Sequence, residues 1–291
     1  MLFWRACVVL PLLLAPPLAH AVPDAVVEGI QMPAWVEREG ARQPLAPGMA
    51  LKVSDEVSTG ANSRLLLRLA DGSTVKLGEN GRLQLAAMRQ SPGRGFLAAT
   101  LKVIEGAFRF TTAAALKARR TRDITVQFPT LTAGIRGTDI WGKNLGERQV
   151  LVLIEGKVTV SRRSGETLEM ADPLTYLQAE QGGAAHVQPI DMQQLRAWAA
   201  ETEIAGDQGA VRKGGRWKLY LGDFRHQLEA LVVYDSLRRD GYPVRIQPQQ
   251  SDGAQLYRVR LAGFATEQEA NALGARLKQA NPRLEPVASL Q

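Results

Sequence analysis

The chain has 291 residues, a formal net charge of +7 at pH 7 and one cysteine, Cys7. Because this cysteine lies within the first ten residues, the rest of the chain excludes disulfide scaffolds, thiolate metal sites and a cysteine nucleophile. The length leaves room for two domains of ordinary size, each with its own apolar core. The modest basic excess favours anionic surroundings but does not by itself identify a partner.

The first 21 residues have the composition of a cleavable signal peptide. One early positive charge, Arg5, precedes an apolar run over residues 6–18 and the small-residue triplet Ala19-His20-Ala21. A transmembrane anchor is the competing interpretation, but the run falls short of roughly 20 residues and contains three prolines. We therefore expect export to the periplasm, with residues 22–47 as an N-terminal segment and no transmembrane segment in the mature protein.

Residues 48–200 are predicted to form an all-β domain that ends in one short helix. Short β-branched or leucine-rich runs alternate with turn residues, and Asp71-Gly72 is a hairpin signal because both residues tolerate positive φ. Near the end of this region, Asp191 is the predicted N-cap of a helix that carries Leu195 and Trp198 on one side.

Two segments of this region share one pattern. Residues 103–110 match residues 153–160 in character, and each contains Ile-Glu-Gly near its start. Such an internal repeat indicates two structural units of the same design. We expect each to be a strand, a turn at the Glu-Gly pair, and a second strand.

Residues 201–215 contain four glycines and are predicted to be a flexible linker. Residues 216–291 then alternate between strand and amphipathic helix patterns in the order βαββαβ. This order predicts an α+β, ferredoxin-like (RNP-like) domain in which two helices cover one face of a four-stranded antiparallel sheet. The apolar stripes of the two predicted helices have the same spacing, counted from Phe224 and from Phe264.

The C-terminal segment resembles the SPOR domain, the sporulation-related repeat of envelope proteins. The residues that carry the resemblance include Leu219-Tyr220-Leu221-Gly222-Asp223-Phe224, Gly241-Tyr242-Pro243-Val244 and Leu256-Tyr257-Arg258-Val259-Arg260. The resemblance implies binding to peptidoglycan glycan strands that have lost their stem peptides, which the family associates with division sites. Tyr220 stands where a glutamine is common in the family.

The segment over residues 48–160 resembles the FecR-like periplasmic domain. The resemblance is carried by Asp55-Glu56-Val57-Ser58-Thr59-Gly60, Leu69-Ala70-Asp71-Gly72-Ser73 and Ile135-Arg136-Gly137-Thr138. It implies the family's fold. The family's transmembrane signalling role is not expected here, because a signal peptide is predicted in place of the membrane helix. For Arg136-Gly137-Thr138 we favour a structural turn, with the arginine bridging neighbouring strands, over a ligand contact, and Trp141 is expected in the core.

Strand alternation predicts which side chains lie on the sheet face opposite the two C-terminal helices. This open face is rich in guanidinium groups, which bind hydroxyl and carboxyl groups, and it also carries an aromatic ring that can stack on a sugar. The predicted glycan-binding residues are Lys218, Tyr220, Arg245, Gln247, Arg258 and Arg260. The alternative is that they form the ordinary solvated face of an antiparallel sheet.

Other function classes fit the sequence less well. The same sheet order also occurs in RNA-binding modules, but an exported protein is not expected to meet RNA. The two histidines outside the signal segment, His186 and His226, are far apart, and no carboxylate pair or nucleophile motif is evident. We therefore expect a non-enzymatic protein without metal or cofactor that binds peptidoglycan. The alternative function is a periplasmic sensory or regulatory adaptor whose FecR-like domain binds an envelope protein.

Overall fold

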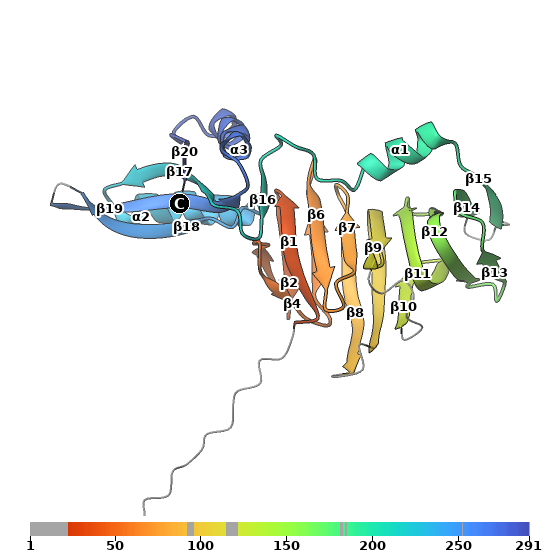
Figure 1. The fold of residues 1–291 in the computed structure, drawn as a ribbon. Helices are drawn as coiled ribbons and strands as arrows, with labels where there is room; N and C mark the ends of the chain where they lie inside the picture. Colours follow the sequence, from red (N-terminus) through yellow and green to blue (C-terminus); the bar gives the residue numbers. More distant parts are fainter. Residues whose placement is uncertain are drawn as a thin grey trace, which may run out of the picture.

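The structure is a computed structural model that describes residues 23–91, 96–114, 122–180, 183, 185–251 and 253–290. The predicted signal peptide, residues 1–21, lies outside the described residues. A β domain and a smaller C-terminal domain lie side by side (Figure 1). Among the described residues, no helix combines the length and the apolar character needed to cross a membrane.

The β domain consists of two sheets, and three long strands pass from one sheet into the other. In spatial order, the first sheet contains β16 (Ala210–Arg212), β1 (Ala25–Gln31), β6 (Arg64–Leu69), β7 (Thr74–Leu77), the second half of β9 (Phe96–Thr111), the second half of β11 (Leu131–Asn144), the first half of β12 (Arg148–Arg162), β14 (Thr175–Glu180) and β15 (Ala185–Pro189). The short strand β4 (Ala50–Leu51) also pairs with β1.

The second sheet uses the other halves of the same three strands. In spatial order it contains β3 (Ala41–Pro44), β2 (Ala34–Arg38), β5 (Glu56–Thr59), β8 (Arg82–Ser91), the first half of β9, β10 (Arg122–Gln127), the first half of β11, the second half of β12, and β13 (Thr167–Met170). Only β9 and β10 pair in parallel among these described strands; the other pairs are antiparallel. The N-terminal segment thus supplies β1 to the first sheet, and β2 and the edge strand β3 to the second sheet.

The main core lies between the two sheets. Alternate residues of each strand are buried, as in β6, where Leu65, Leu67 and Leu69 are inside and the residues between them are more exposed. Val57, Leu83 and other residues of the second sheet belong to the same apolar cluster. This period of two is the expected pattern for strands with one face on a core.

The two Ile-Glu-Gly segments are bends within single strands, so the predicted strand-turn-strand units are wrong in this detail. Gly106 and Gly156 have φ of +80° and +90°, which glycine adopts without steric cost. A Cβ on Gly106 would lie 2.7 Å from Gly81 Cα, and a Cβ on Gly156 would lie 2.7 Å from the Gly137 oxygen. Each glycine therefore lets a strand change direction and continue into the other sheet.

The Arg136-Gly137-Thr138 element of β11 lies against Gly156, where β12 bends. The β11–β12 register shifts between Arg136 and Asp139, and Gly137 has φ of +69°. This supports a structural role for the element. The expected bridge by its arginine is wrong, because Arg136 is exposed and has no ion pair with any residue that the structure describes.

Helix α1 (Met192–Ala200) covers the outer face of the first sheet. The side chain of Asp191 accepts hydrogen bonds from the backbone N–H groups of Gln193 and Gln194, as expected for an N-cap. Trp198 stacks on Trp141 with ring centroids 5.1 Å apart and an interplanar angle of 6°. The predicted helix and the buried position of Trp141 are confirmed.

Residues 201–215, here called the strap, are anchored to the rest of the protein and do not form the flexible linker that their glycines indicated. The strap crosses the outer face of the first sheet and contains β16, which pairs with β1 at the sheet edge (Figure 1). Ala210 and Val211 are fully buried. The side-chain contacts that hold the strap are Lys143–Glu201 at 2.8 Å, Arg109–Glu203 at 3.2 Å, Lys76–Glu203 at 2.5 Å, and the Ala205 N–H donating to Gln31 Oε1 at 3.2 Å.

The C-terminal domain has the predicted element order βαββαβ. Its elements are β17 (Trp217–Phe224), α2 (Gln227–Arg239), β18 (Arg245–Ser251), β19 (Ala254–Phe264), α3 (Glu267–Ala280) and β20 (Val287–Leu290). The strands lie in the order β20-β17-β19-β18, with all neighbours antiparallel. Both helices pack on one face and line a shared groove, and their buried partners in the sheet include Leu219, Leu221, Val259 and Leu261.

The two domains are joined by contacts on both sides of the strap. Val211 of β16 pairs with Phe264 of β19, so β16 belongs to both domains. The carboxylate of Glu269 in α3 accepts hydrogen bonds from the N–H groups of Asp207 at 3.1 Å and Ala210 at 2.8 Å. On the helix side, the Trp35 indole donates to the Arg239 carbonyl at 3.1 Å.

Replacement of Glu269 tests this junction. We expect Glu269→Ala to lower the free energy of unfolding by about 2 kcal/mol, because the buried Ala210 N–H would lose a charged acceptor. The control is Glu267→Ala, an exposed residue of the same helix turn. Chemical denaturation followed by far-UV circular dichroism measures both, and equal losses in the two variants would contradict the assigned role of Glu269.

Candidate functional site

The six residues predicted for the open face lie on three neighbouring strands of the C-terminal sheet. They alternate with the buried residues that face the helices, so their side chains lie on the opposite face. The register places Tyr220 and Arg245 on either side of Arg260, and Gln247 opposite Arg258. The structure thus brings together Lys218, Tyr220, Arg245, Gln247, Arg258 and Arg260.

Tyr220 and Arg258 form a cluster with a third residue, Asp223. The guanidinium of Arg258 lies 4.6 Å from the centroid of the Tyr220 ring. It also donates two hydrogen bonds to the Asp223 carboxylate, from Nε at 2.6 Å and from Nη2 at 2.5 Å. These bonds lower the pKa of Asp223 and raise the pKa of Arg258. Asp223 therefore holds the Arg258 guanidinium in position over the tyrosine ring.

Simple alternation does not place Asp223 in this cluster. Counting from the buried Leu219 and Leu221, residue 223 would face the helices. A β-bulge changes this, because the register advances by two residues from Tyr220 to Gly222 while the partner strand advances by one. Gly222, which lies inside the observed β17 but just beyond the strand predicted over residues 217–221, is the kind of residue that marks such a bulge.

The second group, Arg245, Arg260 and Gln247, carries unneutralised charge. Arg260 donates from Nε to Gln247 Oε1 at 2.9 Å. This bond gives one guanidinium N–H an acceptor, but the neutral amide does not balance the positive charge. Arg245 is exposed and lies directly opposite Arg260. Within the described part of the chain, neither arginine forms an ion pair with a carboxylate, and the same holds for Lys218.

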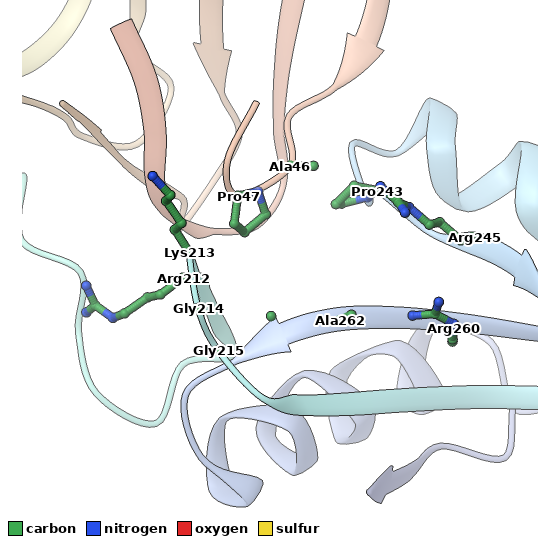
Figure 2. Close-up of a pocket in the computed structure, with 11 residues that line it drawn as sticks. Ala46, Pro47, Arg212, Lys213, Gly214, Gly215, Pro243, Arg245, Arg260 and Ala262 are labelled. Carbon is green, nitrogen blue, oxygen red and sulfur yellow. The ribbon is translucent and has the colours of Figure 1, made fainter. Parts of the chain in front are cut away.

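One end of the open face meets the β domain and forms a pocket there. The pocket has a volume of about 250 Å³. In Figure 2, Arg245 and Arg260 come from the C-terminal sheet and Pro47 comes from the β domain, whereas the side chains of Arg212 and Lys213, on the segment between the domains, extend away from the two arginines. The residues that line the pocket are Ala46, Pro47, Arg212, Lys213, Gly214, Gly215, Pro243, Arg245, Arg260, Ala262 and Gly263. Sequence reasoning did not predict the contribution of the β domain.

The chemistry of the face suits a polar, partly anionic polymer. Its guanidinium groups provide several N–H donors in one plane, which match hydroxyl and carboxylate oxygens. No group of three or more histidine, cysteine, aspartate or glutamate residues that could hold a metal ion occurs among the described residues. The arrangement therefore favours recognition by hydrogen bonds, charge and stacking.

Comparisons with known proteins give four findings. No curated protein matches the chain. Two crystal structures of a "putative anti-sigma factor" from Parabacteroides distasonis ATCC 8503 are similar to it, at 16% and 15% identity and a TM-score of 0.42 each. The matches cover 81% of this chain and 99% and 98% of those chains. Residues 55–159 match the family model described as FecR protein, and residues 213–286 match the SPOR domain. The chain therefore carries a FecR domain followed by a C-terminal SPOR domain.

Proposed function

We propose that this chain is a non-catalytic periplasmic protein whose SPOR domain binds denuded glycan strands of peptidoglycan and thereby places the FecR domain at division sites. The observation that carries the proposal is the open face of the SPOR sheet. There, Tyr220, Arg258 and Arg260 lie side by side on strands whose other face is buried under two helices. SPOR domains bind peptidoglycan, and this face offers the groups that such a polymer requires.

The cluster of Tyr220, Arg258 and Asp223 is arranged for sugar binding before the ligand arrives. Asp223 holds the guanidinium in place, so little side-chain entropy is lost when a sugar binds. One face of the Tyr220 ring is occupied by Arg258. The sugar therefore stacks on the exposed plane of the guanidinium or on the free part of the ring, while Arg260 and Gln247 bind its hydroxyl groups.

The anchored strap gives this binding a consequence for the FecR domain. Because β16 pairs with strands of both domains, the FecR domain takes a defined orientation when the SPOR sheet binds a strand. The protein would then present a fixed surface of its β domain next to the wall polymer.

The second candidate function is a sensory or regulatory adaptor in the periplasm. The match of residues 55–159 to the FecR family favours it. In that case the FecR domain binds a protein partner, and the SPOR domain contributes only packing or protein contacts. The two functions differ in whether the purified chain binds peptidoglycan.

Retention of the full chain on purified sacculi separates these functions. We expect amidase treatment, which removes stem peptides, to increase retention because it exposes denuded strands. Absence of retention both before and after treatment would contradict the proposed function and favour the adaptor. Localisation of a fluorescent fusion in dividing cells tests the placement at division sites.

The double variant Tyr220→Ala with Arg258→Ala tests the site itself. We expect sacculus binding to weaken by roughly ten- to hundredfold, because stacking and hydrogen bonds from a charged group contribute about 1.5–3 kcal/mol. The matched control is Tyr234→Ala with Arg238→Ala, which removes another arginine-tyrosine contact, of 5.3 Å, on helix α2. Cooperative thermal unfolding of both variants shows that the fold persists. Unchanged binding by the first variant would place the site elsewhere.

The Asp223–Arg258 ion pair predicts a pH dependence of stability. Because the folded-state pKa of Asp223 is lowered, the pair stabilises the fold fully above the unfolded-state pKa of about 3.9 and loses this effect as pH falls through the folded-state value. We expect the stability difference between the wild type and Asp223→Asn to be constant from pH 7 to about pH 5 and to shrink below about pH 4. Urea unfolding at each pH measures it. A difference that does not shrink in acid would contradict the lowered pKa.

A further inference from the structure

We infer that the groove between helices α2 and α3 binds an acidic segment of a partner protein. This helix-side groove is lined by the buried Leu237, Leu277 and Leu284, and it is bordered by Pro33 and Trp35 of the β domain. It lies on the covered side of the SPOR sheet, opposite the face proposed to bind glycan. The inference therefore goes beyond the proposed function and does not depend on it.

The size and the lining of the groove are the first observation. Its volume is about 570 Å³, which falls within the roughly 300–1,000 Å³ of pockets that enclose a ligand. The half-buried Val233 adds to the apolar surface of the three leucines, whereas Ser236 and Asn281 are polar and exposed. An apolar centre with a polar rim is the arrangement found at protein interfaces.

The wall that the β domain contributes is fixed in place, which is the second observation. The Trp35 indole N–H donates to the Arg239 carbonyl at 3.1 Å, and the Arg42 guanidinium lies 4.2 Å from the centroid of the Trp35 ring. A Cβ on Gly241 would lie 2.7 Å from Cε2 of Trp35, so the indole packs directly against the end of α2. The groove is therefore formed before a ligand binds, and its occupant does not have to order it.

An arginine without a counter-ion is the third observation. Arg276 of α3 lines the groove, and within the described part of the chain it forms no ion pair and donates no hydrogen bond. Its Nη2 atom is buried beside the strap, 3.1 Å from the position of a Cβ on Gly209. An unbalanced charge in a partly buried position favours a ligand carboxylate, which would supply both an acceptor and a negative charge.

The other polar groups of the groove leave an excess of positive charge. Burial raises the pKa of the Tyr242 phenol, whereas Arg276 lowers it and Asp240 raises it, so these three groups lie within electrostatic range of one another. Arg239 donates from Nε to the Asp235 carbonyl at 3.3 Å, which leaves its charge unbalanced. The lining thus contains two arginines and one carboxylate, that of Asp240. This balance is complementary to an acidic partner.

The occupant that matches these features is a segment in which an aspartate or glutamate lies near an apolar residue. The apolar side chain packs on the leucines, and the carboxylate accepts hydrogen bonds from Arg276 and the Tyr242 hydroxyl. A glycan matches less well, because its hydroxyl groups would meet mostly apolar carbon between the helices. Binding here leaves the opposite face of the sheet open, so the chain can hold the wall polymer and a partner protein together.

The test probes the full chain with a synthetic peptide array. Each acidic member combines leucine or phenylalanine with aspartate or glutamate at randomised positions. Its neutral counterpart has asparagine or glutamine in place of each acidic residue. We expect acidic members to retain the fluorescently labelled chain and their neutral counterparts to bind it at least about tenfold more weakly, because the neutral amide cannot balance the arginine charge.

Two variants locate the peptide in the groove. Ala280→Trp fills the groove, Arg276→Gln removes its unpaired charge, and we expect each to lower retention on the acidic members by about tenfold. The matched controls are Ala275→Trp, an exposed position on the same helix, and Arg225→Gln, an exposed position before α2. Neither control residue lines the groove, so both variants should bind as the wild type does. Thermal unfolding of each variant verifies its fold.

The outcomes separate this inference from the proposed function. Equal retention on acidic and neutral members, or retention on neither, would overturn it. If the variant Tyr220→Ala with Arg258→Ala loses retention while Ala280→Trp keeps it, the peptide binds the open face and the inference is wrong. Sacculus binding by Ala280→Trp should equal that of the wild type, because the glycan face is on the other side of the sheet.

Discussion

The arrangement of the whole molecule depends on β16, a strand of three residues that pairs with both domains. It closes the edge of the first sheet through β1 and reaches β19 through Val211 and Phe264. Its backbone is fixed from a third side by Glu269, whose carboxylate accepts the Ala210 N–H. Because these bonds are buried, separating the domains would expose apolar surface and leave polar groups unpaired. These contacts therefore fix the position of the SPOR domain relative to the FecR domain, and with it the pocket between them.

A second constraint shapes the β domain itself. Strands β9, β11 and β12 each serve two sheets, and each must change direction where it leaves one sheet for the other. Gly106 and Gly156 make this possible through positive φ and through backbone contacts too close for any side chain. The close approach of Gly156 to Gly137 thus gives the FecR-like Ile135-Arg136-Gly137-Thr138 motif a structural role at the bend of β12.

The basic residues at and beside the open face fall into two groups, one paired with a carboxylate and the other not. Arg258 is paired with Asp223 and lies over the Tyr220 ring. Arg245, Arg260 and Lys213 keep their charge and lie around the pocket at the domain junction.

The sequence by itself determined the element order of the C-terminal domain, the helix that begins after Asp191, and the face on which the six site residues lie. These features follow from local patterns, namely the periods of 2 and 3.6 and capping chemistry, which act over a few residues. Only the tertiary structure decided that a glycine-containing segment is an anchored strap, that a bulge turns Asp223 toward Arg258, and that Pro47 and Lys213 border the site. The physical reason is that each of these depends on partners distant in sequence: β1 and Glu269 for the strap, Arg258 for Asp223, and the packing of one domain against the other for the pocket.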